Sequence, residues 1–386
     1  MKICDVVLNS VWHDPRVTKQ VREYIKADFE VVCVGMKCKR YDEDKIAAMP
    51  CRVIVTERDA RYGGKQKSIL KKLLRAKFRV DSVVQAIIEE KPDVIHANDL
   101  DALIPSYLAS RKLGCRLIYD SHEICCETRY YDKYWLYDRF MRVTERYIVK
   151  RCDLMVCVSH AAAEYFQREF HIEKPLVITN CVLRKDVLDE YPKKHEGFEV
   201  LNHGIFHDSR GLEMMRDSCP FFSGKENIRM AARGYGGIEK SLKDQVARDR
   251  LDNFLFYPPV DPDMLIREAA RSHVGVAVTL PVCLNFELSV SNRLFEYAAA
   301  GLPVIMSDIP EHRYLNERYH FGVVIENNER EAFERAVLRL YTDTAFYEEC
   351  SRNARKLTLD ISWEKQFSQL IAYLRSDFGE IKDGEK

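Results

Sequence analysis

Residues 2–35, KICDVVLNSVWHDPRVTKQVREYIKADFEVVCVG, decide the fold. The stretches 2–9 and 30–35 are continuous runs rich in valine and isoleucine, without strict polar alternation. Such runs are typical of strands that are buried on both faces of a parallel sheet. Residues 16–27 between them have the length of a helix, which parallel strands need as a crossover. The segment therefore predicts one strand–helix–strand unit of an α/β domain.

The same alternation continues outward from this unit. Strand-like runs follow at 52–56, 93–97, 116–120, 154–159 and 176–180, with helix-length segments at 79–90, 101–113, 136–151 and 160–170. A second series has strand-like runs at 199–205, 228–232, 254–257, 274–278, 303–307 and 322–325. At 386 residues the chain is also too long for one ordinary core. We predict an α/β fold of two Rossmann-like domains whose parallel sheets face an interdomain cleft, since open α/β sheets bind ligands at the carboxyl ends of their strands.

The expected domain boundaries follow from the interruption between the two series. Residues 183–198 are polar and charged and include Pro192, so they form the linker. We expect an N-terminal domain at 1–182 and a C-terminal domain at 199–360. Residues 361–378 have an amphipathic pattern and form a C-terminal helix that packs back on the first domain. Residues 379–386 are expected to be a disordered tail.

Composition limits the class of protein. Sixty basic and sixty acidic residues cancel, so no global field favours nucleic acid. The start lacks the pattern of a signal peptide, and no window of about 20 apolar residues exists, so we expect a cytoplasmic chain. The thirteen cysteines include no C-x-x-C pair and no zinc-ligand spacing, which favours buried, reduced thiols.

Several motifs carry a family resemblance. In chain order they are DPRVTKQVREY, KPDVIHANDLDAL, LIYDSHE, CDLMVCVSHAAAEYF, ITNCVL, HGIFHDSRGLEMM, SNRLFEYAAAGLPVIMSDIPEHRYL and ISWEKQ. Together they span nearly the whole chain, which resembles the group 1 family of retaining GT-B glycosyltransferases. The long motif that starts at Ser291 is similar to the nucleotide-sugar-binding segment of that family. The resemblance therefore implies that the C-terminal domain at 199–360 binds the nucleotide sugar and that the N-terminal domain at 1–182 binds the acceptor.

The resemblance implies a retaining transferase that moves a sugar from a nucleoside-diphosphate-sugar donor to a glycan or to a polyprenyl-linked or glycolipid acceptor, in polysaccharide biosynthesis. It implies no cofactor and no metal, with the nucleotide sugar as substrate. Three alternatives stay open. A GT-B-fold epimerase or a phosphorylase would use the same kind of cleft, and a non-catalytic chain could bind nucleotide sugar as the partner of a transferase.

Glu296 is the first candidate for binding the donor. The resemblance implies that its carboxylate accepts hydrogen bonds from the vicinal ribose hydroxyls, which suits a group that only accepts. The structural alternative is that Glu296 stabilises the start of a buried helix, where backbone N–H groups are unpaired. Ser291 and Asn292 are expected to supply further donors to the diphosphate.

Cations and glycines complete the expected donor site. Arg210 and Arg293 are predicted to bind the diphosphate, because a leaving nucleoside diphosphate gains negative charge. The alternative for both arginines is a solvated surface position. Gly204 and Gly234 would let backbone approach the ligand, although residues 233–237 equally suit a tight strand–helix turn.

The candidate catalytic residues are His122, Arg210 and Glu287. The resemblance places a sugar-contacting histidine near His122, for which a satisfied structural histidine is the alternative. Glu287 lies one residue from where the family carries the first of two glutamates, a position that Leu288 occupies here.

Polar residues in the strand–helix loops of the first domain are the expected acceptor site. They are Asp14, Arg16, Asn98, Asp99 and Glu123. Asp14 and Arg16 could instead pair with each other, and Asn98 or Asp99 could cap the next helix.

Two further patterns concern metals and membranes. The spacings Asp99-x-Asp101 and Asp261-x-Asp263 match the D-x-D of metal-dependent sugar transferases, but such triplets are common by chance in a chain with 60 acids. Residues 61–79 hold eight basic and no acidic side chains, with apolar residues at roughly helical spacing. This segment is either a domain helix with a solvated basic side or a peripheral contact with the anionic inner face of the cytoplasmic membrane.

Overall fold

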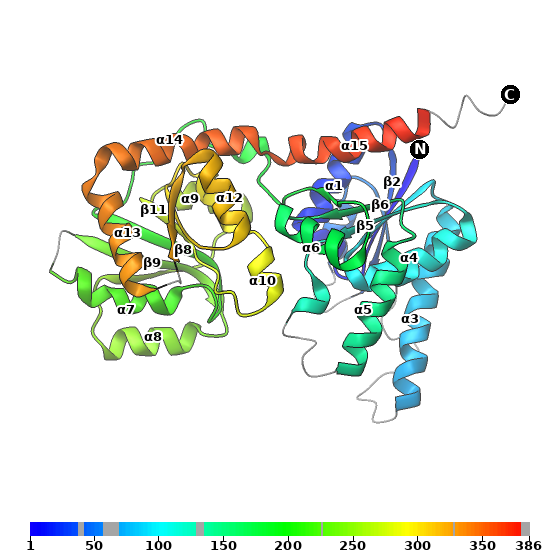
Figure 1. The fold of residues 1–386 in the computed structure, drawn as a ribbon, viewed down its shortest axis with the longest axis horizontal. Helices are drawn as coiled ribbons and strands as arrows, with labels where there is room; N and C mark the ends of the chain where they lie inside the picture. Colours follow the sequence, from blue (N-terminus) through cyan, green and yellow to red (C-terminus); the bar gives the residue numbers. More distant parts are fainter. Residues whose placement is uncertain (38–41, 57–68, 129–134, 225–226, 327–328, 380–386) are drawn as a thin grey trace. The chain divides into compact units, whose positions relative to one another are not determined.

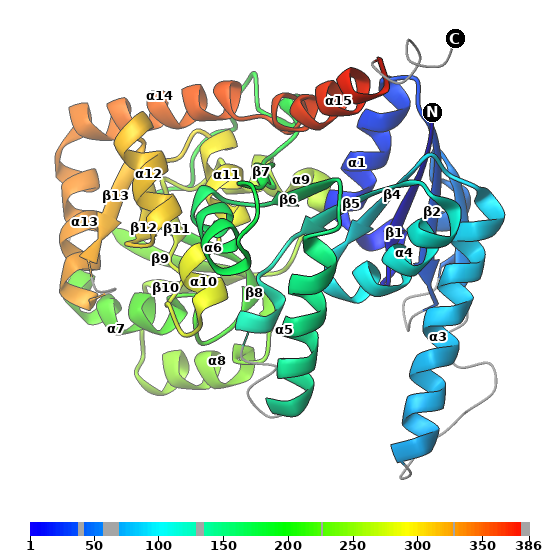
Figure 2. The same ribbon diagram turned by 45° about the vertical axis from the view of Figure 1, so that its right-hand side comes forward.

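The computed structural model describes residues 1–37, 42–56, 69–128, 135–224, 227–326 and 329–379 (Figures 1 and 2). The chain divides into two compact units, residues 1–178 with 366–386, and residues 179–365. Each unit is built on one sheet in which all strand pairs are parallel. The predicted fold of two Rossmann-like α/β domains is confirmed. The predicted tail lies outside the described residues apart from Gly379.

The first unit has seven strands in the order β3-β2-β1-β4-β5-β6-β7. Its strands are β1 (Lys2–Val7), β2 (Glu30–Met36), β3 (Arg52–Thr56), β4 (Val94–Asn98), β5 (Arg116–Ser121), β6 (Leu154–Cys157) and β7 (Leu176–Val177). Its helices are α1 (Pro15–Lys26), α2 (Glu43–Ala47), α3 (Ile69–Glu90), α4 (Asp99–Leu113), α5 (Trp135–Val149) and α6 (His160–Phe170), with short 3-10 turns η1 (Val11–His13) and η2 (Cys125–Glu127). The strand order reverses between β1 and β4, which is where doubly wound sheets bind ligands.

The second unit has six strands in the order β10-β9-β8-β11-β12-β13. Its strands are β8 (Phe198–Phe206), β9 (Ile228–Gly236), β10 (Phe254–Tyr257), β11 (Val274–Ala277), β12 (Val304–Ser307) and β13 (Gly322–Ile325). Its helices are α7 (Leu212–Phe222), α8 (Glu239–Arg248), α9 (Pro262–Ala269), α10 (Leu284–Leu288), α11 (Asn292–Ala299), α12 (Pro310–Tyr319), α13 (Arg330–Thr342) and α14 (Thr344–Asp360), preceded by η4 (Arg184–Asp186). Here the order reverses between β8 and β11.

The last helix, α15 (Trp363–Gly379), contributes to the first unit from Gln366 onward. The ring of Phe367 lies 5.0 Å from that of Tyr24 on α1, edge to face. Arg375 Nη2 donates to the carbonyl of Ala27 at 3.1 Å. The C-terminal helix therefore packs on α1.

Burial explains why the strands could be located from apolar runs. Along β1, Ile3, Cys4, Val6 and Val7 are all buried, and Asp5 is buried with them. A strand that is covered on both faces needs apolar side chains at odd and even positions alike, which removes the alternation. A buried carboxylate in such a strand is an exception that needs partners.

The structure corrects two of the expected elements and adds a short helix. Helix α3 begins at Ile69 rather than 79, and the short helix α10 was not predicted. Strand β9 continues through Gly236, so Gly234 and Gly236 lie in a strand, whereas Gly237 lies in the strand–helix turn. Gly234 pairs with Gly204 of β8, and a Cβ on Gly234 would lie 1.9 Å from the carbonyl oxygen of Gly204. Gly234 is thus required by close approach of two strands.

Candidate functional site

The predicted site residues gather at the carboxyl edges of the two sheets. In the first unit, Asn98 ends β4 and His122 directly follows β5. In the second unit, Gly204 lies near the end of β8, and Arg210 follows that strand. Parallel strands end at a common edge, so residues far apart in sequence meet there.

Glu296 lies on α11, in the second unit, and not in its first turn. The helix begins at Asn292, and its first turn contains no acidic residue, so the helix-start interpretation of Glu296 is wrong. One carboxylate oxygen of Glu296 lies 2.7 Å from Nε2 of His203. The side chain of Glu296 is 26% exposed, whereas that of His203 is only 1% exposed. The Glu296 side chain thus contacts a buried histidine and keeps part of its own surface exposed.

His203 is a residue that the sequence analysis missed. Its backbone N–H donates to the hydroxyl of Tyr297 at 2.8 Å, and the two rings lie 4.3 Å apart. Its Nδ1 is buried and has no hydrogen-bond partner in the described part of the chain. Because an ionised carboxylate only accepts, the contact with Glu296 assigns a proton to Nε2. The signal was available, since two polar residues, Asn202 and His203, interrupt the apolar run of β8.

Arg293 is buried and not solvated. Its Nη1 donates to Oδ1 of Asn202 at 2.7 Å, and its Nη2 donates to the carbonyl of Val278 at 2.8 Å. Its Nε lies 3.4 Å from the hydroxyl of Ser291. Burial lowers the pKa of Arg293 to about 10, and the nearby charge of Arg210 acts in the same direction. Arg293 therefore holds the end of β11 to the start of α11, and its contact with a diphosphate stays a prediction.

Arg210 is half-buried in the loop between β8 and α7. Its guanidinium carbon lies 5.9 Å from the centre of the Phe286 ring, and its carbonyl accepts from Nδ2 of Asn202 at 2.8 Å. Gly211, with a φ of +77°, is the residue before the first turn of α7. A cation beside a helix N-terminus provides two sources of positive potential for an anion.

Three further predicted donor or catalytic residues lie on α10 or at the start of α11. Glu287 is exposed on α10, Asn292 is exposed at the first position of α11, and Ser291 before it is buried. The short helix α10 directly precedes α11 in the chain. Their roles stay predictions.

In the first unit, Arg16 and Asp120 form a buried ion pair. Nε and Nη2 of Arg16 donate to the two carboxylate oxygens of Asp120 at 2.9 and 2.8 Å. Nη1 donates to the carbonyl of Ile178, and Gln20 donates to Asp120 at 2.6 Å. Burial alone would raise the pKa of Asp120, but Arg16 and His122 outweigh it and hold that pKa well below its usual range. The guanidinium of Arg16 forms its ion pair with Asp120 and not with Asp14. The Asp14 carboxylate instead accepts from the backbone N–H groups of Arg16 and Val17 at the start of α1.

His122 lies among three polar partners. Its Nδ1 is 3.2 Å from a carboxylate oxygen of Asp99, and its Nε2 is 3.1 Å from Oδ1 of Asn98. Burial by itself lowers the pKa of His122, but the carboxylates of Asp99 and Asp120 outweigh it and raise the pKa to about 10. The imidazole is therefore a cation at neutral pH, and both ring nitrogens act as donors. A cationic imidazole can stabilise negative charge but cannot act as a base.

Asn98 connects His122 to a second buried carboxylate. Nδ2 of Asn98 donates to Asp5 at 2.5 Å and to the carbonyl of Val6 at 3.2 Å. Burial raises the pKa of Asp5 to about 6. Asn98 is fully buried, whereas Glu123 is exposed. Of the expected acceptor residues, Asn98 and Arg16 thus form the buried floor of this edge, while Asp14, Asp99 and Glu123 retain exposed surface.

We expect the stability that His122 contributes to decrease as pH rises. The unfolded imidazole loses its proton near pH 6.5 and the folded one near 10, so the contribution is complete below 6.5 and is lost toward pH 10. Urea unfolding should show that the stability difference between wild type and His122→Gln is about 3 kcal/mol smaller at pH 9 than at pH 6. His160→Gln serves as the control. An equal difference at both pH values would contradict a protonated His122.

The other patterns in the sequence concern metal ligands, membrane contact and cysteines. Among the described residues, no group of three His, Cys, Asp or Glu side chains is placed to hold a metal ion, and metal independence stays a prediction. No helix in the described ranges is both long enough and apolar enough to cross a bilayer. Much of the basic segment 61–79 lies outside the described residues, which resume at Ile69. The described cysteines are free thiols, and most are buried.

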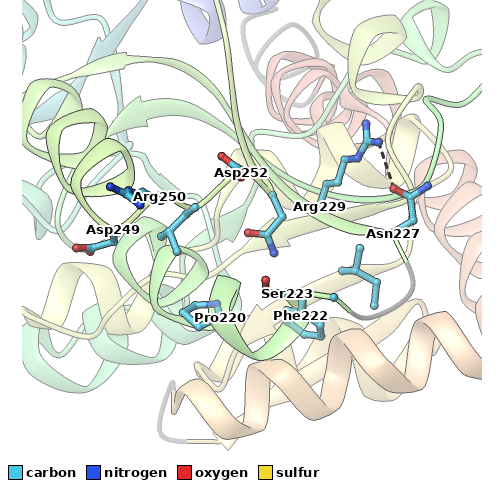
Figure 3. Close-up of a pocket in the computed structure, with 12 residues that line it drawn as sticks. Pro220, Phe222, Ser223, Asn227, Arg229, Asp249, Arg250 and Asp252 are labelled. Atoms are coloured by element: carbon cyan, nitrogen blue, oxygen red, sulfur yellow. Dashed lines mark hydrogen bonds between the residues drawn. The ribbon is translucent and has the colours of Figure 1, made fainter.

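A cavity of about 630 Å³ lies at the opposite edge of the second sheet (Figure 3). Its lining includes Asn227 and Ile228 at the start of β9 and Asn253 before β10. Arg229 on the rim donates to Asn227 at 3.1 Å. None of the predicted site residues lines this cavity. It is separate from the carboxyl edge.

Comparisons with known proteins agree with the fold. Residues 16–182 match the family model described as Glycosyltransferase Family 4, and residues 197–343 match the model described as Glycosyl transferases group 1. No curated protein matches the sequence at a significant level. Together the two family models cover most of both units.

Solved structures with this fold are similar over nearly the whole chain. Sucrose-phosphate synthase (tll1590) from Thermosynechococcus elongatus has 15% identity and a TM-score of 0.78, covering 98% of this chain and 100% of that one. Anabaena Alr3699/HepE, solved with UDP and glucose, has 16% identity, a TM-score of 0.75 and coverage of 97% and 100%. A point mutant of S. aureus TarM, solved with fondaparinux, α-GlcNAc-glycerol and UDP, has 11% identity, a TM-score of 0.68 and coverage of 96% and 99%.

Proposed function

Since the chain is a glycosyltransferase of the group 1, GT-B type, we propose that it is a retaining, metal-independent enzyme that uses a nucleoside-diphosphate-sugar donor. The acceptor is a glycan or a lipid-linked glycan. The observation that carries the proposal is the partly exposed Glu296 carboxylate, held by buried His203 near the carboxyl end of β8. This is the edge at which sheets of this topology bind nucleotides.

The chemistry of the second unit supports the donor assignment. A carboxylate offers about four acceptor sites, so one that accepts from His203 can also accept hydrogen bonds from a ribose diol. Arg210 and the start of α7 place positive potential in the same loop region, where the diphosphate gains charge as it leaves. UDP bound to HepE and to TarM makes UDP the first nucleotide to test.

The first unit supports the acceptor assignment in a different way. The cationic His122, with Asp99 beside it, forms a charged rim over the buried Arg16–Asp120 pair. Carboxylates and imidazolium groups suit the hydroxyls of a sugar, which both donate and accept. The glycan bound to TarM is in keeping with an acceptor of this class. The basic segment 61–79 suits an acceptor that is presented at an anionic membrane.

A nucleotide panel tests the donor assignment. Thermal unfolding with UDP, GDP, ADP and CMP should show stabilisation by one diphosphate, worth about 2.7 kcal/mol at a hundred-fold excess over Kd. NMR of the product formed from the matching sugar nucleotide should show that the anomeric configuration of the donor is kept, with EDTA present throughout. Stabilisation by none of the four would overturn the proposal. Inversion, or loss of turnover that Mg²⁺ restores, would overturn the retaining or the metal-independent part.

A further inference from the structure

Helix α5 carries an exposed apolar stripe that the proposed chemistry does not use. Leu136, Phe140, Val143 and Tyr147 are 66%, 61%, 63% and 51% exposed. At 3.6 residues per turn these four side chains fall within roughly 60° of one another around the helix. Large apolar side chains on a folded surface are usually scattered, and a contiguous group marks an interaction site.

The stripe extends onto the neighbouring helix α4. The rings of Tyr107 on α4 and Tyr147 on α5 lie 6.3 Å apart, edge to face. Leu108 beside Tyr107 is 41% exposed. Six of the twelve exposed large apolar side chains in the described chain, counting Tyr137, therefore lie on α4 and α5. We name Leu108 with the four residues of the stripe the α5 surface.

Basic side chains flank the α5 surface. The exposed ones on or directly after α5 are Arg139, Arg146, Lys150 and Arg151, and those on α4 are Arg111 and Lys112. The two acids of α5 face away from this surface. Asp138 accepts from Arg142 at 2.7 Å, and buried Glu145 accepts from Tyr119 at 2.7 Å. The exposed side of α5 is thus apolar along its centre and positive along its borders.

We propose that the α5 surface docks on an anionic lipid bilayer, with the stripe inserted among the headgroups and the basic border on the lipid phosphates. A helix with an apolar centre and Lys/Arg borders is the form that interfacial membrane helices take. A second copy of the chain fits less well, because a two-fold contact would oppose the same basic borders. The inference does not depend on the proposed reaction.

Co-sedimentation of the full chain with vesicles tests the inference. Wild type should bind phosphatidylglycerol-rich vesicles and bind pure phosphatidylcholine vesicles at least ten-fold more weakly. Lys150→Gln should lower partitioning to anionic vesicles about five-fold, since each basic residue near such a surface contributes about 1 kcal/mol. Leu136→Ser/Phe140→Ser should abolish it while the melting temperature stays unchanged, because both side chains are exposed.

The matched control is Met264→Ser/Leu359→Ser, which replaces two exposed apolar residues of the second unit. Failure of wild type to bind anionic vesicles would overturn the inference, as would equal loss of binding in the control. So would a concentration-dependent dimer that Leu136→Ser/Phe140→Ser dissociates without vesicles, or saturable binding of an acidic protein that anionic vesicles do not compete. Nucleotide binding by the same variants is measured separately, so failure of the proposed reaction is distinguishable from failure of docking.

Discussion

Replacing Arg16 with methionine is expected to lower the free energy of unfolding by about 3–5 kcal/mol, the cost of leaving one member of a buried ion pair without its partner. The guanidinium of Arg16 is 3% exposed and the carboxylate of Asp120 is 1% exposed. Methionine fills similar volume but cannot donate, so the Asp120 charge would be left with Gln20 and His122. Urea unfolding at pH 7 measures the loss.

Arg22→Met is the matched control, because Arg22 is an exposed arginine on the same helix. It should change stability by less than about 0.5 kcal/mol. Adding Asp120→Asn to Arg16→Met removes the stranded charge and should recover part of the lost stability. Equal effects of Arg16→Met and Arg22→Met would contradict a structural role for the pair and would favour direct contact with the acceptor.

The positions of the strands could be predicted from the sequence because a strand that is buried on both faces appears as a continuous run of apolar residues. The predicted runs 52–56, 254–257 and 322–325 coincide with β3, β10 and β13. The start of α1 also has a local cause, since Asp14 and Pro15 determine it. Each of these signals lies within a few residues of the element that it specifies.

Interaction partners that are far apart in the sequence could not be predicted in this way. Asp14 lies two residues from Arg16, so a pair between them was a reasonable hypothesis, but the actual partner of Arg16 is Asp120 on β5. The sequence likewise identified Glu296 as a donor-binding candidate without indicating His203. Only the meeting of β8 with α11 brings these two side chains within 2.7 Å. The chemistry of a single residue could be predicted from the sequence. Its interaction partner could not, because the partner depends on how the strands and helices are arranged in the fold.

The surroundings of Arg293 and of Gly234 also could not be predicted from the neighbouring sequence. An arginine in a polar helix start resembles a solvated group, yet the carbonyl of Val278 and the amide of Asn202 surround this one. Gly234 was compatible with a turn or a ligand-binding loop, and its register opposite Gly204 determines its actual place in a strand. In both cases the neighbouring strand, not the local sequence, supplies the physical reason.

Glu296→Gln is expected to weaken binding of the donor nucleotide by roughly ten- to hundred-fold, the effect of losing charge-assisted hydrogen bonds worth about 1.5–3 kcal/mol. The amide keeps one acceptor oxygen for His203, so the buried Nε2–H stays paired and the fold is maintained. The remaining NH2 group donates and no longer accepts from a ribose hydroxyl. Isothermal titration calorimetry with the nucleotide that stabilises wild type measures the loss.

Glu349→Gln, which removes the same charge from an exposed position on α14, is the control and should bind like wild type. His203→Phe separates support from contact, because it removes the group that orients Glu296 but keeps the carboxylate. It should weaken nucleotide binding less than Glu296→Gln does. If Glu296→Gln lowers the melting temperature and leaves nucleotide affinity unchanged, Glu296 serves only as the partner of His203, and the donor must be bound elsewhere.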